Sequence, residues 1–287
     1  MIWLIFSFLF LKLMSVPAVG LSGEPGHLHA GNDTTGVVLE LITSFSAVSD
    51  RFYTDHLDNV YFIDGHRITR ITVTTGRELE YGSLPAGPVT SADVSNPMQL
   101  LLFYRDFNRA VFLDNNLSPL RSAVNFSGLG IEQATLACTS GRGGIWVFSD
   151  REHRLVYFDQ QFRNTHRSII VSSVTGSGDQ PVYMTESQGR LFLFIPRKGI
   201  HLFDRYASYL GTIDYKGPHR FQVLGNRIVW FEDGRLAGMD IVSGEVSLFN
   251  LPGGMVIDDA RLQPDRLYIL SGDLMKVYRI RWETGQN

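Results

Sequence analysis

The chain has 287 residues, of which 44% are hydrophobic, 12% are aromatic and 28 are glycine, and its formal net charge is −3. A chain of this length can bury a substantial core within one all-β domain. The slight negative charge argues against an extended nucleic-acid surface, because neutralising phosphates requires clustered Lys and Arg side chains. The aromatic and glycine content favours β-strands separated by many turns.

The first 20 residues have the pattern of a secretory signal peptide. Residues 2–11 form a continuous apolar run, Lys12 interrupts it, and small residues suited to cleavage follow as far as Gly20. The alternative is a retained membrane anchor, although the apolar stretch is short for a membrane span. No cysteine lies near the cleavage site, which excludes a lipid anchor on an N-terminal cysteine. We therefore expect an exported protein, periplasmic or associated with the outer envelope, in which residues 21–35 form a flexible lead-in.

Apolar hairpins recur at a regular spacing along the rest of the chain. Each consists of two short runs of β-branched, aromatic and aliphatic residues across a tight polar turn. The six hairpins are residues 59–75, 98–114, 144–159, 189–204, 226–240 and 265–282. Successive apolar anchors are 40, 45, 46, 37 and 39 residues apart and are Tyr61, Leu101, Trp146, Phe192, Val229 and Tyr268. This spacing is typical of one four-stranded propeller blade per repeat.

Two further strand-like segments flank each hairpin and complete a blade. The predicted inner strands precede the hairpins and are residues 45–53, 89–94, 131–138, 182–186, 220–224 and 256–262. The predicted outer strands follow polar turns rich in Gly, Asn, Asp and Ser. They are residues 77–83, 117–125, 162–171, 209–215 and 245–250.

The two ends of the repeat array are complementary. The sixth hairpin has no outer strand behind it, whereas residues 36–43 form a strand-like run with no hairpin before it. We therefore predict an all-β, six-bladed β-propeller over residues 36–283, closed by an N-terminal strand that completes the last blade. A seventh blade would require an unrecognised unit within residues 172–181. A β-sandwich would not sustain this period, and a helical solenoid would need 3.6-residue periodicity, which these runs lack.

One stretch of the second repeat resembles a known family. Residues 92–116 read ADVSNPMQLLLFYRDFNRAVFLDNN and are followed by LSP, and this stretch is similar to exported β-propellers common in Bacteroidota. The similarity continues through residues 158–159, 199–204 and 221–223. It implies the propeller fold and an exported location but no activity. More distantly, the blades resemble NHL, YVTN and quinoprotein-like propellers, whose members bind proteins, sugars or cofactors, so the resemblance selects no function.

The hairpin turns supply the candidate binding residues. In a propeller these turns and the blade-to-blade connections lie on one face, where loops on a rigid scaffold commonly recognise ligands. Arg follows or occupies five of the six turns, which predicts a cationic collar suited to carboxylate or phosphate groups. The predicted partner-binding residues are Arg67, Arg105, Asp106, Phe107, Asn108, Arg109, Arg151, Arg154 and Arg197. Phe107 is either a partner anchor or folds back onto the neighbouring blade. The alternative for the arginines is pairing with nearby acidic residues in solvated turns.

We recognise no catalytic motif. Neither HExxH nor GxSxG occurs, and the only histidines with a metal-ligand spacing are His27 and His29, which we interpret as solvated. The acidic pair 258–259 and the glycine-rich residues 141–144 are interpreted as a solvated loop and a turn. Cys138, the sole cysteine, is predicted to be a buried structural thiol.

These patterns predict a non-catalytic exported β-propeller that acts as a scaffold for a protein or a cell-envelope component. We expect no cofactor, no metal site, no nucleic-acid partner and no transmembrane span after signal cleavage. The alternative is an enzyme or a carbohydrate- or cofactor-binding propeller, lyase-like or quinoprotein-like, with its site in the axial channel. Residues remote in sequence, for instance Asp93, Glu132 and Glu186, could converge there from the inner strands. The oligomeric state stays open.

Overall fold

The computed structural model describes residues 37–83, 87–176 and 178–282. Contacts between residues divide the chain into two units, Met1–Thr34 and Thr35–Asn287. The predicted signal peptide and lead-in lie outside the described residues. Within the second unit, the strands form six sheets of four antiparallel strands each. Among the residues described, no helix is both long and apolar enough to cross a membrane.

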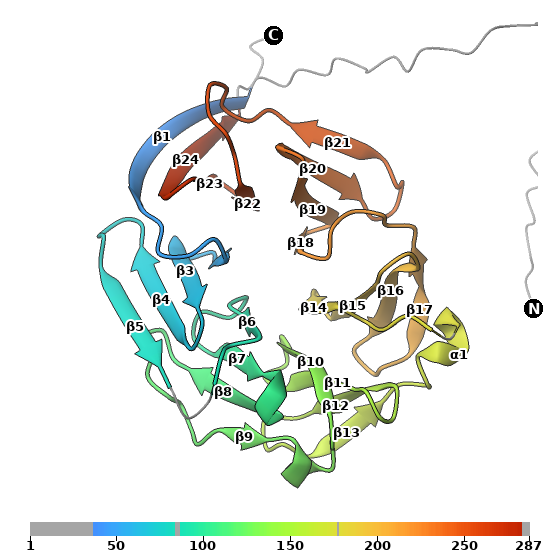
Figure 1. The fold of residues 1–287 in the computed structure, drawn as a ribbon. Helices are drawn as coiled ribbons and strands as arrows, with labels where there is room; N and C mark the ends of the chain where they lie inside the picture. Colours follow the sequence, from blue (N-terminus) through green and yellow to red (C-terminus); the bar gives the residue numbers. More distant parts are fainter. Residues whose placement is uncertain (1–36, 84–86, 177, 283–287) are drawn as a thin grey trace, which may run out of the picture. The chain divides into compact units, whose positions relative to one another are not determined.

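The six sheets are arranged radially about a common axis, which makes the second unit a six-bladed β-propeller (Figure 1). The first blade contains β2 (Phe52–Thr54), β3 (Asn59–Asp64), β4 (Arg67–Thr72) and β5 (Glu78–Gly82), and the second contains β6 (Ser91–Asp93), β7 (Leu100–Tyr104), β8 (Arg109–Leu113) and β9 (Val124–Asn125). The third contains β10 (Ala134–Thr139), β11 (Ile145–Ser149), β12 (Arg154–Phe158) and β13 (Asn164–Arg167), and the fourth contains β14 (Tyr183–Ser187), β15 (Arg190–Ile195), β16 (Gly199–Asp204) and β17 (Tyr209–Ile213). The fifth contains β18 (Phe221–Leu224), β19 (Arg227–Glu232), β20 (Arg235–Asp240) and β21 (Val246–Phe249). The sixth contains β22 (Asp259–Gln263), β23 (Arg266–Ser271), β24 (Leu274–Trp282) and β1 (Val37–Ser46).

The sixth blade is built from both ends of the described chain. Strand β1 pairs antiparallel with β24, with Val37 opposite Trp282 and Ser46 opposite Leu274. The pairing register shifts between Leu41 and Thr43, as at a β-bulge. The predicted closure is therefore confirmed, although β1 extends three residues beyond the predicted 36–43.

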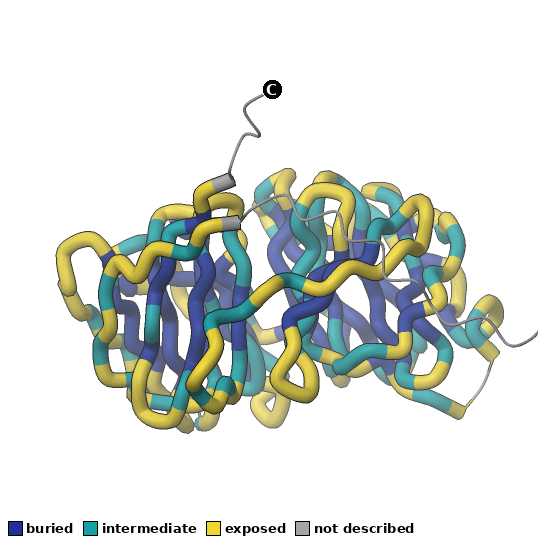
Figure 2. The backbone as a smooth tube through the Cα atoms, turned by 90° about the horizontal axis from the view of Figure 1, so that it is seen from above, coloured by how far each residue is buried: buried dark blue, intermediate teal, exposed yellow. Residues whose placement is uncertain are grey.

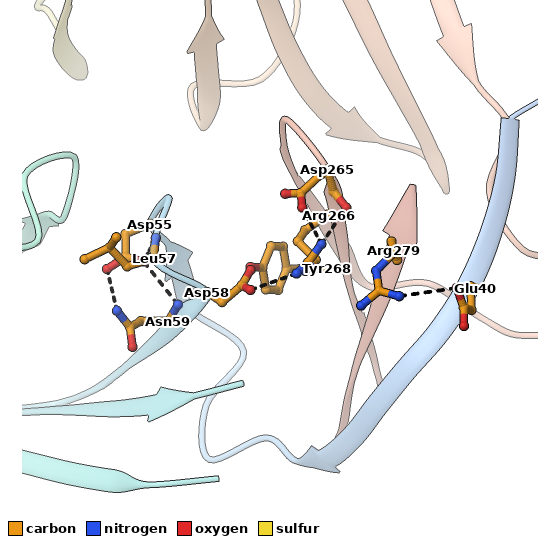
Figure 3. A network of polar contacts seen from close by, with 9 residues as sticks. All are labelled: Glu40, Asp55, Leu57, Asp58, Asn59, Asp265, Arg266, Tyr268 and Arg279. Atoms are coloured by element: carbon orange, nitrogen blue, oxygen red, sulfur yellow. Dashed lines mark hydrogen bonds and ion pairs between the residues drawn. The ribbon is translucent and has the colours of Figure 1, made fainter. Parts of the chain in front are cut away.

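Polar contacts strengthen this closure at the seam between the sixth and first blades (Figure 3). Arg266 of β23 donates from Nη2 to Asp58 Oδ2 of the first blade over 2.9 Å, and the Tyr268 hydroxyl donates to Asp58 Oδ1 over 3.2 Å. On the outer side of the sixth blade, Glu40 of β1 forms an ion pair of 3.6 Å with Arg279 of β24. The Arg266 side chain is only 12% exposed, so its ion pair with Asp58 is screened less by solvent than a surface pair.

The hydrophobic core lies between neighbouring blades. Strands β7 (LLLFY) and β11 (IWVFS) are buried at every position. Because neighbouring strands and blades cover both of their faces, every side chain in these strands can be apolar, which gives a continuous apolar run in the sequence. At the periphery, β5 alternates between exposed and half-buried residues. Trp146 of the third blade belongs to one buried cluster with Leu193 of the fourth. Figure 2 shows the buried residues concentrated in the strands and the exposed ones at the loops.

A repeated aspartate turn joins the third strand to the outer strand in four blades. The carboxylate of Asp159 accepts hydrogen bonds from the backbone N–H groups of Gln161 and Arg163, each over 2.9 Å. These bonds favour the ionised carboxylate and lower the pKa of Asp159. Phe162 between them has a φ of +59°. The equivalent aspartates accept similar bonds and are Asp114, Asp204 and Asp240.

Three segments differ from the sequence-based prediction. The first inner strand covers only Phe52–Thr54 instead of 45–53, because residues up to Ser46 pair with β24. The second outer strand is reduced to Val124–Asn125, because Leu117 has a φ of +58° within the aspartate turn. Helix α1 (Ser172–Thr175) lies in the connection to the fourth blade where a seventh blade would have been needed.

Candidate functional sites: an axial pocket and an apolar groove

The six inner strands line a pocket at the axis, with a volume of about 480 Å³. Successive side chains of a strand point to opposite sides, so part of each short inner strand is directed to the axis. The volume is within the range of small-molecule sites, roughly 300–1,000 Å³. The lining is rich in ionisable residues, which are Arg51, Tyr53, Asp55, His56, Asp93, Arg105, Cys138, Tyr183, Glu186, His219, Arg220 and Arg261. We call this the axial pocket.

The acidic residues of the axial pocket act as links within or between blades. Asp93 of β6 accepts hydrogen bonds from the backbone N–H and the hydroxyl of Thr139 on β10, both over 2.8 Å. Glu186 of β14 accepts the Trp146 indole N–H over 2.6 Å and the backbone N–H of Gly141 over 3.0 Å, both from the third blade. Asp55 accepts hydrogen bonds within its own blade, including the Tyr61 hydroxyl over 2.7 Å. These carboxylates already have their donors.

Two glutamines link the later blades in the same way. Gln222 of β18 donates to the carbonyl of Leu262 and accepts from the N–H of that residue, both over 2.9 Å, so its amide copies a strand pairing. Gln263 of β22 donates to the carbonyl and to the hydroxyl of Thr54, both over 3.1 Å. The inner polar side chains therefore stabilise the ring as well as line the pocket.

Two arginines of the axial pocket also have backbone partners. Arg51 donates from Nη2 to the carbonyl of Val89 over 2.7 Å. Arg220 donates from Nη2 to the carbonyl of Phe52 over 3.1 Å and lies 3.5 Å from Asp259 Oδ2. Arg261 of β22 differs, because it is 8% exposed and no hydrogen bond or ion pair of its side chain is found among the described residues.

Most arginines of the predicted collar contact nearby groups instead of forming one continuous cluster. Arg67 pairs with Glu80 at 3.5 Å, and Arg151 and Arg197 form ion pairs with Glu132 and Asp179 respectively. Arg105 donates from Nε to the carbonyl of Thr135 over 3.2 Å, and Arg154 donates to the carbonyl of Ser168. Only Arg105 among them also lines the axial pocket.

Side-chain contacts hold the turn at 105–108 in place. Phe107 is 42% exposed, and a side chain at Gly87 would collide with its ring. The Arg109 guanidinium lies 5.0 Å from the centre of the same ring. Asn108, with a φ of +49°, accepts the N–H of Ala134 at Oδ1 over 2.8 Å, which fixes the turn to the next connection. Asp106 is exposed at the same turn. Phe107 thus packs on the connection into its own blade while keeping part of its ring in solvent.

Of the remaining residues singled out in the sequence, Cys138 lies within the described part of the chain, whereas the two histidines with a metal-ligand spacing do not. Cys138 is 1% exposed and free, as predicted, and burial raises the pKa of its thiol, with the charges of Asp93 and Glu186 adding to the effect. His27 and His29 lie outside the described residues. Within the described ranges, no three His, Cys, Asp or Glu side chains are grouped as metal ligands.

A second hollow lies on the rim and was missed by the sequence analysis. It has a volume of about 670 Å³ and is lined by Gly234, Arg235, residues 248–252 and residues 255–257. We call it the apolar groove, because its lining includes Leu248, Leu251, Phe249, Met255, Val256 and Ile257. Val256 is 78% exposed and Leu248 is 61% exposed. The run GGMVI at 253–257 was a visible signal, because an apolar run follows glycines where a polar connection is expected.

Arg261 was also missed. Its signal is local: it follows Ala260 and precedes Leu262 in a short inner strand, so a charged side chain stands in a segment that the fold must bury. What the sequence does not contain is the proximity of Tyr53 and Arg220, which come from blades one and five.

Comparison with known proteins supports the fold. No family model matches the sequence, and no curated protein matches it. Among solved structures, a streptogramin B lyase is similar with a TM-score of 0.53 and 10% identity, covering 85% of this chain and 98% of that one. Virginiamycin B lyase from Staphylococcus aureus gives 0.51 and 12%, covering 79% of each chain. A protein of unknown function from Bacteroides caccae gives 0.50 and 13%, covering 74% and 82%. At these identities the likeness shows a β-propeller and nothing further.

Proposed function

We propose that the protein is a non-catalytic, exported β-propeller that binds a protein partner or another cell-envelope component at its rim. The apolar groove carries this proposal. Leu248 and Val256 are mostly exposed beside a hollow large enough to receive side chains of a partner. Soluble proteins rarely expose contiguous apolar surface unless it contacts something else.

The arginines of the hairpin turns add positive charge on other blades, with Arg105 and Arg109 in the second blade and the groove beside β20, β21 and the connection into the sixth blade. Arg105 and Arg109 have no carboxylate partner among the described residues, so their charge is available to an acidic partner. Arg suits this role because its planar donors match carboxylate groups. The signal-like residues 1–20 and the resemblance to exported propellers of Bacteroidota support a partner in the periplasm or the outer envelope.

The groove is tested by site-specific crosslinking in the native host. A photo-crosslinking residue at position 256 is compared with one at position 242, because Val242 is 84% exposed in a turn outside the groove. We expect position 256 to capture a discrete partner that position 242 does not. Purified partner should then bind Val256→Asp at least about tenfold more weakly than Val242→Asp. Equal capture at both positions, or equal affinity of the two variants, would contradict the groove.

A separate arm tests the arginines. Charge reversal of Arg105, Arg109 and Arg154 together should weaken binding of the same partner and make the remaining affinity less sensitive to salt, since the attraction that salt screens has been removed. Reversal of Arg163, which is exposed and pairs with Asp159, is the control. Unchanged affinity after the triple reversal would show that the collar arginines do not contact the partner, and the groove alone would remain as the proposed binding surface.

A further inference from the structure

Arg261 is a buried cation without an ion pair or a side-chain hydrogen bond among the described residues. Its side chain lines the axial pocket, its Nε is buried without a partner, and no carboxylate among the described residues lies within ion-pair distance. Burial lowers the pKa of Arg261, the charge of Arg220 adds to this effect, and the charge of Asp259 opposes it without reversing it. Burying a charge without a partner costs several kcal/mol, by order of magnitude. A carboxylate or phosphate group bound by the guanidinium would offset this cost.

The surroundings of Arg261 form one side of a site. Its guanidinium carbon lies 5.2 Å from the centre of the Tyr53 ring and 5.7 Å from that of Phe52. The guanidinium carbon of Arg220 lies 5.9 Å from the same Tyr53 ring. Two cations therefore flank one aromatic ring, and the ion pair of Asp259 is with Arg220, while its charge acts on Arg261 from a greater distance.

The acidic residues of the pocket cannot supply the missing charge. Asp55, Asp93 and Glu186 each accept hydrogen bonds from residues of their own or a neighbouring blade. The Nε of Arg70 is also buried without a hydrogen-bond partner among the described residues, but Arg70 lies on β4 and does not line the pocket. The combination of a buried unpaired guanidinium, a second cation and an open pocket is thus found at Arg261.

The chemistry of these groups defines the ligand. A guanidinium fork binds carboxylate or phosphate oxygens in pairs, and the second cation stabilises the same anion. The pocket, at about 480 Å³, is larger than a single ion needs. Tyr183 lines it and packs edge-on against Phe221 with ring centres 4.8 Å apart, which offers an apolar wall. We infer that the axial pocket binds a small organic molecule through a carboxylate or phosphate group held by Arg261 and Arg220.

The test titrates the purified protein with sodium succinate or with inorganic phosphate, at ionic strength held constant with sodium chloride. Either probe should raise the thermal unfolding midpoint of the wild type, since a ligand that binds only the folded state stabilises it. The affinity for the effective probe should fall at least about tenfold in Arg261→Met and less in Arg261→Lys. Arg163→Met, whose site lies in an exposed turn, should bind as the wild type does.

The two probes distinguish the anionic group. A response to succinate alone assigns a carboxylate ligand, and a response to phosphate alone assigns a phosphorylated one. No response of the wild type to either probe overturns the inference, as does an equal response of the wild type and Arg261→Met. The lysine variant retains the charge, so it keeps the comparison possible if the methionine variant does not fold. The result is independent of the apolar groove, which these substitutions leave intact.

Discussion

Replacement of Glu186 by Ala should destabilise the propeller without needing any ligand. The change removes the acceptor of the Trp146 indole N–H, at 2.6 Å, and of the Gly141 backbone N–H, at 3.0 Å. Trp146 is fully buried, so its N–H has no replacement partner. A hydrogen bond to a charged group contributes about 1.5–3 kcal/mol and an unsatisfied buried donor costs about 1–3 kcal/mol, and since these overlap we expect a loss of about 2–4 kcal/mol.

Urea denaturation at neutral pH measures this loss, and the denaturant slope should stay constant if only stability changes. A double-mutant cycle with Trp146→Phe isolates the pair, with an expected coupling of about 1.5–3 kcal/mol. Glu132→Ala is the matched control, because Glu132 forms an exposed ion pair with Arg151 and should change stability by less than about 1 kcal/mol. A Glu186→Ala protein as stable as Glu132→Ala would mean that Glu186 is a free carboxylate of the axial pocket and not a blade link.

Three further results follow from the fold. Deleting the chain through Ser46 removes β1 and should lower the free energy of unfolding by more than about 4 kcal/mol, which exceeds the effect of most single substitutions. A chain that begins at Thr35 keeps β1 and should retain the stability of the full chain. Similar stability of the two shortened chains would contradict closure by β1. His201 is 3% exposed, and its burial, followed by the charge of Lys198, lowers its pKa below the ordinary value of 6.5. The unfolded chain therefore binds a proton at His201 more readily than the folded protein does. The contribution of neutral His201 to the free energy of unfolding is complete above pH 6.5 and is lost as the pH falls below it, by at most about 1.4 kcal/mol per pH unit. Urea titrations at several pH values should show a smaller loss in His201→Asn, and an identical slope would disprove this role. Gly199→Ala should lower the free energy of unfolding by more than about 2 kcal/mol, since the new Cβ would lie 2.3 Å from the Ile213 carbonyl oxygen. Gly272 has open space around it, so Gly272→Ala should lower the free energy of unfolding by about 1 kcal/mol, for its positive φ alone. Equal losses in the two variants would show that the backbone moves to relieve the contact at position 199.

The hairpins were predictable because the covered strands leave a strong local signal. Strand β7 reads LLLFY and β11 reads IWVFS, and each is followed by a polar turn and a second apolar run. The closure was predictable from counting, since an unpaired strand at the start matched a missing one at the end. The short outer strand β9 was overestimated, because the left-handed conformation of Leu117 cannot be recognised from its side chain.

The binding features were harder to predict for a different reason. The collar arginines are adjacent to turns in sequence, but their partners, such as Glu80 for Arg67, depend on cross-strand register. The axial pocket joins residues from six strands of three to six residues each, so Tyr53, Arg220 and Arg261 are neighbours only after the ring closes. Sequence spacing carries no signal for such a meeting.

The division of the pocket's polar residues into blade links and a buried cation without an ion pair is tested most directly on β22, where Arg261 and Gln263 are two positions apart. Gln263→Ala removes two hydrogen bonds to Thr54 and should lose about 1–2 kcal/mol in ligand-free urea denaturation. Arg261→Met removes a buried unpaired charge and should be at least as stable as the wild type. A methionine variant that loses as much stability as Gln263→Ala would show that Arg261 is structural and would contradict the account.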